Sequence, residues 1–173
     1  TGFLLHVPGI MALLSMPVAW WADERWGLVG LGWTAGLALL GGQGLVWLGR
    51  HAGAFQRYQS MQIAAISWLL IALLGALPFI ASARLAPDGS AMALALAVFQ
   101  FPVYAIFESV SGFTSTGLTV VATASELPAH IQWWRSFSEW VGGIGVILLL
   151  IAVLPADRGA LNLYFSEARE EKI

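Results

Sequence analysis

Three long apolar runs without a charged residue limit what this chain can fold into. They cover residues 2–22, 26–49 and 58–83, and none contains Asp, Glu, Lys or Arg. At 1.5 Å per helical residue, each run is long enough to cross about 30 Å of hydrocarbon. Only 10% of all residues are charged, whereas a soluble domain averages about 25%. The sequence therefore predicts an all-α integral membrane protein.

Composition excludes several other classes of protein. A net charge of −2 is too small to indicate nucleic-acid binding, and the absence of cysteine excludes disulfides, thiolate metal sites and cysteine nucleophiles. The three histidines, His6, His51 and His130, show no metal-ligand spacing. No basic segment precedes the first apolar run, so no cleavable signal peptide is predicted. Because the chain starts at Thr1 rather than Met, we expect a piece of a longer protein.

The distribution of basic residues sets the expected topology. Short loops rich in Lys and Arg stay in the cytoplasm, which places the loop at 50–57 and the basic C-terminal tail on the same side. An even number of crossings must then separate them, and residues 58–83 and about 136–155 supply two. If the apolar segment at 91–107 also crossed fully, the tail would lie outside. This segment is therefore expected to enter the membrane and return, which predicts four transmembrane helices plus one re-entrant pore helix and loop.

The re-entrant segment has the composition of an ion filter. Pro102 suits the first turn of a helix, and a helix over about 102–114 would be only ~18 Å long, too short to cross. Small hydroxyl residues and one glycine follow, and Thr114 to Thr119 is expected to return extended. Non-helical backbone lies at membrane depth only where protein or water surrounds it, and exposed carbonyls there can replace the hydration shell of a cation. Residues 107–119 are therefore interpreted as a pore helix and one quarter of a selectivity filter.

Individual residues of this stretch have expected roles. Gly117 permits backbone angles that other residues avoid, so that successive carbonyls can point toward one axis. The preceding helix aims its C-terminus, with about half a negative charge, at the loop. The side chains of Thr114, Thr116 and Thr119 are expected to bond to backbone groups and hold the loop's shape. Glu108 has two open interpretations: an anchor bonded to nearby N–H or hydroxyl groups, or a charge that attracts cations.

The remaining polar and small residues are assigned to the surface or to helix packing. Arg135 and Glu139 lie four positions apart on the last span and are expected to pair, with Arg135 as an anchor at the outer interface. Glu126 and His130 are expected to be solvated. Further predictions are interfacial tryptophans at Trp133 and Trp134, bends at Pro8 and Pro17, and a break near Pro78. Close helix packing is expected in the second span, at the pair Gly32 and Gly36 and at the further small residues Gly27, Gly30, Gly41, Gly42 and Gly44. The last span is expected to pack closely or to be flexible at Gly142, Gly143 and Gly145.

Two motifs resemble a known family. Residues 107–120, FESVSGFTSTGLTV, resemble the first pore loop of the Trk/Ktr/HKT superfamily of potassium transporters, most closely its TrkH branch. Residues 134–147, WRSFSEWVGGIGVI, with AVLP at 152–155, resemble the helix that follows this loop. The resemblance covers about residues 58–173, whereas the first two spans match only in number.

The resemblance implies a subunit with four such repeats around one pore. Residues 1–52 would be two N-terminal transmembrane helices, and residues 53–173 the first helix–pore loop–helix repeat with its cytoplasmic tail. The family filter is built from backbone carbonyls beside one glycine per loop. Ser115, Thr116 and Gly117 would therefore present their carbonyls to K+, the transported ion. A second Thr is common in the branch at the position of Ser115, a difference that matters little for a carbonyl ligand.

The same resemblance implies potassium uptake by a multi-pass protein of the bacterial inner membrane. It implies contact with membrane lipid and with the three remaining repeats, a homodimer, and a cytoplasmic nucleotide-binding regulatory subunit of the TrkA type. No nucleic acid is expected. Passive flow and transport coupled to Na+ or H+ are both compatible with the sequence.

Two other functions fit the residues. The chain could be a complete small subunit of a homotetrameric cation channel, or a membrane scaffold that transports nothing and merely buries the loop. An intramembrane hydrolase is disfavoured because Ser111 and Ser115 lack a His or Lys base at membrane depth. We therefore expect no enzymatic activity.

Overall fold

The computed structural model describes residues 2–51 and 57–153, and this part of the chain is helical and contains no strand. The expected positions of the basic tail and of Pro155 lie outside the described residues. In chain order the elements are α1 (Gly2–Trp21), α2 (Gly27–Leu48), η1 (Gly49–His51), α3 (Arg57–Gly75), α4 (Leu77–Leu85), α5 (Ala91–Leu96), η2 (Ala97–Gln100), α6 (Pro102–Phe113), η3 (Ala124–Glu126) and α7 (Ala129–Val153).

Within residues 2–51 and 57–153, three segments are long and apolar enough to cross a membrane. They are Gly2–Trp21, Gly27–His51 and Met61–Leu85, which confirms the three runs predicted from the sequence. The fourth predicted crossing, at about 136–155, falls on α7 as far as Val153, and its last two residues lie outside the described range. With 25 residues, α7 is about 37 Å long, which is sufficient for a span.

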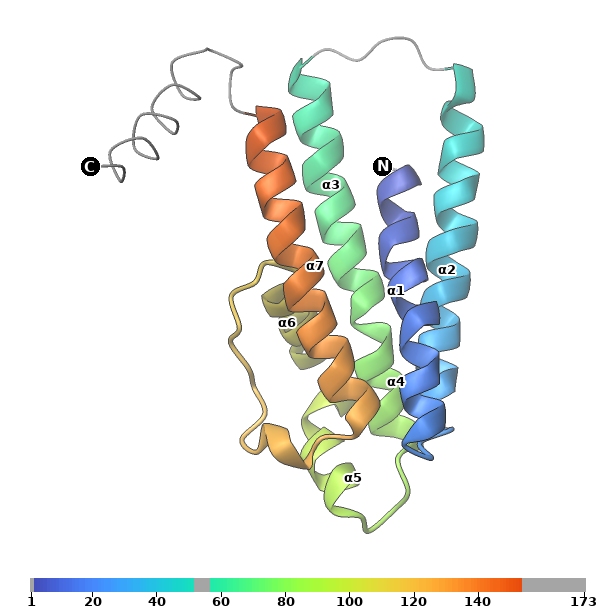
Figure 1. The fold of residues 1–173 in the computed structure, drawn as a ribbon, viewed down its shortest axis with the longest axis vertical. Helices are drawn as coiled ribbons and strands as arrows, with labels where there is room; N and C mark the ends of the chain where they lie inside the picture. Colours follow the sequence, from blue (N-terminus) through green and yellow to red (C-terminus); the bar gives the residue numbers. More distant parts are fainter. Residues whose placement is uncertain (1, 52–56, 154–173) are drawn as a thin grey trace, which may run out of the picture.

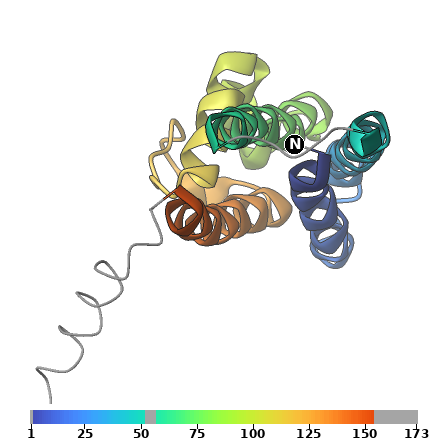
Figure 2. The same cartoon turned by 90° about the horizontal axis from the view of Figure 1, so that it is seen from above.

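The ends of the long helices gather at two opposite ends of the molecule. Figure 1 shows the end of α2, the start of α3 and the end of α7 at one end, and the α1–α2 turn, α5 and η3 at the other. This placement agrees with the topology predicted from the basic residues. Viewed from above in Figure 2, α1 and α2 form a pair to one side, while α7 and the short helices before it surround α3 and α4.

Helix α2 buries a stripe that includes Leu31, Thr34 and Ala38 and repeats every three or four residues. Close approach occurs at some of the α2 glycines that were predicted to allow it and not at others. A Cβ on Gly30 would lie 2.8 Å from Cβ of Ala81, whereas a Cβ on Gly36 would meet nothing within 4 Å. Close packing at Gly30 is therefore confirmed, whereas the prediction for the Gly32 and Gly36 pair is wrong, because these two residues lie off the most buried face of α2. Helix α1 continues through both of its prolines.

The segment after α3 is broken twice. Helix α3 ends at Gly75 and α4 begins at Leu77, so the predicted break near Pro78 is confirmed. The chain then bends by 96° between Ala91–Gln100 and Pro102–Phe113. Phe101 is extended because a residue before proline disfavours the helical region, and Pro102 starts α6. The expected short helix is confirmed over 12 residues, and it packs against α3 and α7.

Candidate functional site

Helix α6 ends in a Schellman motif whose left-handed residue is a serine. The N–H of Thr116 donates to the carbonyl of Ser111 at 2.9 Å, and the N–H of Ser115 donates to that of Gly112 at 2.8 Å. Between these bonds, Ser115 adopts φ 53°. Glycine is the usual residue at this position, because a side chain there costs about 1–2 kcal/mol. Ser115 is thus a strained non-glycine residue in the site, and its left-handed conformation was not predicted from the sequence.

The next residues leave α6 without regular structure and are exposed. Gly117 has φ 72°, as expected from its predicted role, and a Cβ at this position would meet nothing within 4 Å. Glycine is therefore required here by conformation rather than by space. Residues 114–119 are all exposed in the chain. Two left-handed residues, Ser115 and Gly117, alternate with ordinary ones along this segment.

Hydroxyl side chains hold the loop, as predicted, although one of them uses a different partner. Thr114 Oγ1 donates to the carbonyl of Val110 at 2.8 Å and lies 2.6 Å from Thr116 Oγ1. Thr116 therefore contacts a neighbouring hydroxyl rather than backbone. Ser111 Oγ donates to the carbonyl of Leu118 at 2.6 Å, so the far side of the loop is tied back to α6.

A buried carboxylate holds the outgoing limb of the loop. Glu108 is 2% exposed and accepts from the Thr119 hydroxyl at 2.8 Å and from the N–H of Val120 at 3.1 Å. Arg135 on α7 donates its Nε–H to the same carboxylate at 2.5 Å. These contacts agree with the anchor interpretation of Glu108. A buried carboxylate with three donors is a rigid connection between α6, the loop and α7.

The pairing predicted for Arg135 is wrong. Its partner is Glu108, not Glu139 one turn along the helix, and the Arg135 side chain is only 16% exposed. Both charged groups are largely buried, and a buried charge is costly unless an opposite charge compensates it. The ion pair between Arg135 and Glu108 is therefore favoured over a pair between Arg135 and Glu139. Trp134 also departs from the prediction of an interfacial belt: it is fully buried, and its Nε1–H donates to the carbonyl of Gly75 at 3.0 Å.

Glycines on α7 let the end of α6 approach the backbone of this helix. A Cβ on Gly142 would lie 2.5 Å from the carbonyl oxygen of Phe113, and one on Gly143 would lie 3.2 Å from Ser115 Oγ. Ser115 Oγ in turn donates to the carbonyl of Glu139 at 2.6 Å. Close packing is therefore the observed role of Gly142 among the interpretations left open by the sequence.

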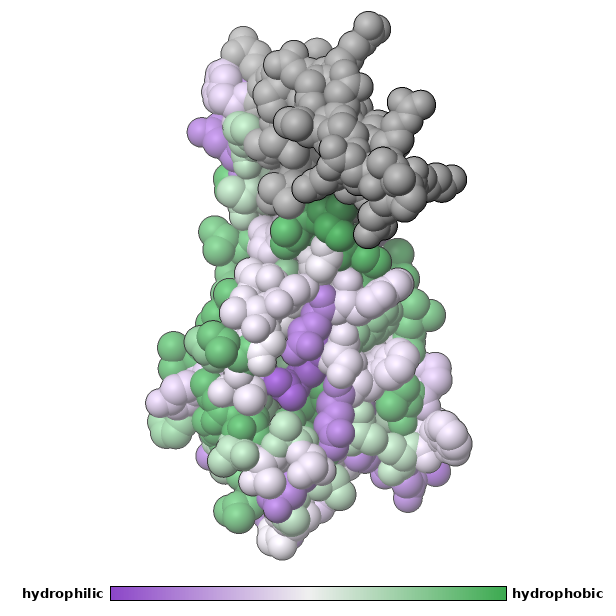
Figure 3. Space-filling model, turned by 60° about the vertical axis from the view of Figure 1, so that its left-hand side comes forward, coloured by the Kyte–Doolittle hydropathy of each residue, from purple (hydrophilic) through white to green (hydrophobic). Residues whose placement is uncertain are grey.

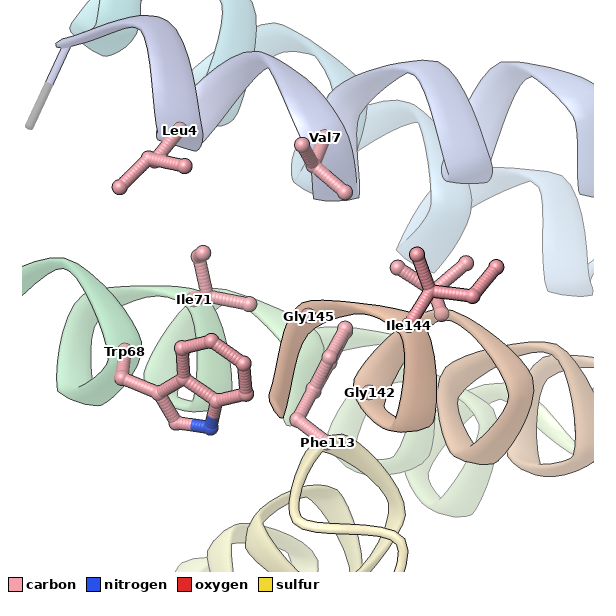
Figure 4. Close-up of a pocket in the computed structure, with 9 residues that line it drawn as sticks. Leu4, Val7, Trp68, Ile71, Phe113, Gly142, Ile144 and Gly145 are labelled. Atoms are coloured by element: carbon pink, nitrogen blue, oxygen red, sulfur yellow. The ribbon is translucent and has the colours of Figure 1, made fainter. Parts of the chain in front are cut away.

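A cavity of about 280 Å³ lies behind the end of α6, between α1, α3 and α7. In Figure 4, Leu4 and Val7 extend from α1 toward Ile71 and Phe113 across it. Its lining is almost entirely apolar, so it offers no oxygen ligands for a cation. By contrast, Figure 3 shows a narrow hydrophilic streak between apolar areas on the side that carries the loop.

A second buried polar cluster lies at the opposite end of α7. His130 is fully buried, which contradicts its expected solvation. Its Nδ1–H donates to Glu24 at 2.5 Å, and its Nε2 lies 2.8 Å from Ser82 Oγ. Burial lowers the pKa of His130, while Glu24 opposes this effect, and a neutral ring would satisfy both partners. The acid–His–Ser order is that of a hydrolase, but Ser82 is 1% exposed, so a substrate could not reach it.

The long apolar helices are those expected of an integral membrane protein. Residues 37–173 match the TrkH family, described as cation transport protein, and the chain belongs to this family. No solved structure matches the chain significantly.

Curated relatives are similar over most of this chain. It is 34% identical over 168 residues to the Trk system potassium uptake protein TrkH of Halomonas elongata, covering 95% of this chain and 30% of the relative. The TrkH of Escherichia coli K12 is 32% identical over 163 residues, covering 93% and 29%. An uncharacterized cation transporter of Methanocaldococcus jannaschii is 35% identical over 117 residues, covering 67% and 22%. The chain thus spans between a fifth and a third of the length of these relatives.

Proposed function

We propose that this chain is the N-terminal part of a potassium uptake protein and supplies one of four loops of a selectivity filter. Residues 1–52 form two N-terminal transmembrane helices, and residues 53–173 form the first helix–pore loop–helix repeat, whose second membrane crossing begins within α7 at about residue 136. The names of the relatives, potassium uptake proteins, support the transported ion. K+ is the substrate in this proposal, not a resident cofactor.

The observation that carries this proposal is the geometry at the end of α6. A 12-residue helix, too short to cross a bilayer, stops at Phe113, and exposed residues that include the left-handed Ser115 and Gly117 follow it. Backbone of alternating hand can turn successive carbonyls toward one side, where they replace the water around a cation. The carbonyls of Ser115, Thr116 and Gly117 are the proposed ligands of K+. The C-terminal end of α6 adds partial negative charge near them.

The carboxylate of Glu108 has a supporting role in this mechanism. Its oxygens are occupied by Thr119, Val120 and Arg135, so its charge is already compensated. It therefore fixes the outgoing limb of the loop and does not bind the ion. A rigid loop keeps the spacing of its carbonyls when the ion has left, which a reproducible filter requires.

The remaining assignments are part of the same proposal, and membership of the family supports them. The protein lies in the bacterial inner membrane, in contact with lipid. The other three repeats of the same full-length chain complete the pore, two such chains form a homodimer, and a cytoplasmic nucleotide-binding subunit of the TrkA type regulates it. The same filter could serve passive flow or symport.

The decisive experiment measures rubidium uptake by the full-length protein in bacteria that lack other potassium uptake. Gly117→Ser is compared with wild type and with Gly89→Ser. Gly89 is a matched control, because it has φ 75° and equally open surroundings but lies in the loop between α4 and α5. Both substitutions impose the same backbone strain.

We expect Gly117→Ser to abolish uptake or its discrimination against Na+ at unchanged membrane expression, while Gly89→Ser transports normally. Normal and selective uptake by both variants would reject the filter assignment and favour a non-transporting scaffold. Complementation by residues 1–173 alone would instead support the small homotetrameric channel.

A further inference from the structure

Ser115 occupies a backbone position that selects glycine. It is the left-handed residue of the Schellman motif, with φ 53°, and its side chain is not needed to end the helix. Strain of this kind persists only where the surrounding structure determines it, and it is a pointer to function. Ser115 differs from the glycine that would fit better by its Cβ, which causes the strain, and by its hydroxyl, which can form a hydrogen bond.

The hydroxyl connects the loop to α7. Ser115 Oγ donates to the carbonyl of Glu139 at 2.6 Å, and Gly143 leaves room for it, since a Cβ there would lie 3.2 Å from the same oxygen. The neighbouring hydroxyls behave differently: Thr114 and Thr116 contact each other, and Thr114 bonds back to α6. Of these three side chains, that of Ser115 reaches across to the neighbouring helix.

We propose that the hydroxyl of Ser115 is a positioning group, which fixes the filter loop against α7 and sets how sharply the pore distinguishes K+ from Na+. This inference rests on the proposed function. The carbonyls of Ser115, Thr116 and Gly117 are consecutive, so a shift of the first residue displaces all three ligands together. Discrimination between the two ions depends on how many carbonyl dipoles converge and how firmly they are held.

Three substitutions at this position separate the hydroxyl from the backbone. Ser115→Gly removes the hydroxyl but relieves the strain, Ser115→Ala removes it and keeps the strain, and Ser115→Thr keeps it but adds a β-branch at positive φ. Ser136→Ala on α7 is the control, because Ser136 is exposed and its hydroxyl forms no hydrogen bond among the described residues. For each full-length variant, the measurements are rubidium uptake, its KM, its inhibition by Na+, and the melting temperature in detergent.

We expect Ser115→Gly to melt at or above the wild-type temperature and yet discriminate against Na+ about three- to tenfold less well, as expected for the loss of one hydrogen bond. Ser115→Ala should lose both discrimination and stability. Ser115→Thr should retain discrimination despite a lower melting temperature. If the hydroxyl had a purely structural role, Ser115→Gly should discriminate against Na+ as well as wild type, because this variant is at least as stable.

Wild-type discrimination in Ser115→Gly would overturn the inference. Gly117→Ser, measured in the same assay, distinguishes this failure from that of the proposed function. If Gly117→Ser loses discrimination and Ser115→Gly does not, the filter stands and the role of the hydroxyl is rejected. If neither variant changes, both assignments are rejected.

Discussion

The imidazole of His130 lies 2.5 Å from a carboxylate oxygen of Glu24, although 106 positions separate the two residues. The same carboxylate accepts from the backbone N–H groups of Ala129 and His130 at 2.8 and 3.0 Å. A negative charge at the first N–H groups of a helix stabilises it. The turn between α1 and α2 therefore caps α7, and it attaches the N-terminal helix pair to the helix that flanks the loop.

Removal of the Glu24 charge tests this cap. We expect Glu24→Gln to lower the free energy of unfolding by about 2 kcal/mol, because the amide accepts fewer of the three donors and faces them with an N–H group of its own. The measurement is thermal unfolding of the full-length protein in detergent. Asp23→Asn is the matched control, because the carboxylate of Asp23 is next to Glu24 in the sequence but is 87% exposed. It forms only an exposed ion pair with Arg25, which contributes little to stability. Equal losses in both variants would contradict the cap.

The pH dependence of stability should report on His130. Burial lowers the pKa of His130 in the folded chain below its ordinary value of 6.5, so above this pH the ring is neutral in both the folded and the unfolded chain. As the pH falls below 6.5, the unfolded chain takes up the proton first, and stability is lost. We expect the melting temperature to fall between about pH 7.5 and about pH 5.5.

The variant His130→Asn isolates this contribution. Asparagine can keep an N–H for Glu24 but does not titrate, so its melting temperature should be lower at about pH 7.5 and should change less on acidification. The ring also faces Ser82, Trp26 and Gly27, none of which titrates in this range, so Glu24 is the other titratable group among the described contacts of the ring. An unchanged slope in His130→Asn would assign the acid sensitivity to other groups.

The sequence predicted the features that depend on neighbouring residues. Charge-free length identified the three apolar segments, Pro102 marked the start of α6, and Gly117 marked a left-handed residue. Each of these signals acts within one helix or one turn, where chain geometry is set by a few residues. The tie between Glu24 and His130 has no such signal, because it joins residues that are adjacent only after the helices pack.

Where the sequence failed, tertiary burial overrode a local rule. The spacing of Arg135 and Glu139 favours a pair one turn apart, but the buried Glu108 needs a cation and lies within reach. Ser115 was missed as a left-handed residue because that conformation is ordinarily signalled by glycine or asparagine. Its bond to α7 could not be inferred without the position of that helix.

The pair of Glu108 and Arg135 provides a prediction for the anchor of the loop. Glu108→Gln leaves the guanidinium of Arg135 without its countercharge in a mostly buried place, and we expect a loss of about 3–5 kcal/mol in the free energy of unfolding. Arg135→Gln should be similarly harmful. The double variant should lose less than the sum of the two single losses, by about 1–3 kcal/mol, because the two groups are directly coupled.

Glu139→Gln is the control for this cycle. Glu139 is the local partner that helix spacing favours, but its carboxylate forms no ion pair among the described residues. We therefore expect a change within about 0.5 kcal/mol. Strictly additive losses in Glu108→Gln and Arg135→Gln would contradict the pair. A large effect of Glu139→Gln that vanishes when Arg135 is replaced would show instead that Arg135 pairs with Glu139 along the helix.

Two glycine-to-alanine substitutions should act in opposite directions. In Gly142→Ala, the new Cβ would lie 2.5 Å from the carbonyl oxygen of Phe113 and 2.9 Å from that of Gly112. Both contacts are with backbone, which cannot rotate away, so α6 must move off α7 at a cost of about 1–3 kcal/mol. In Gly36→Ala the Cβ meets nothing within 4 Å, and the better helix propensity of alanine should stabilise α2 by up to about 1 kcal/mol.

Melting temperatures of the two full-length variants, Gly142→Ala and Gly36→Ala, test the sign of each change in stability. Rubidium uptake tests the functional consequence, because displacement of the end of α6 should impair uptake in Gly142→Ala alone. A rise in stability for both variants would show that α6 does not rest on α7 as closely as these distances require.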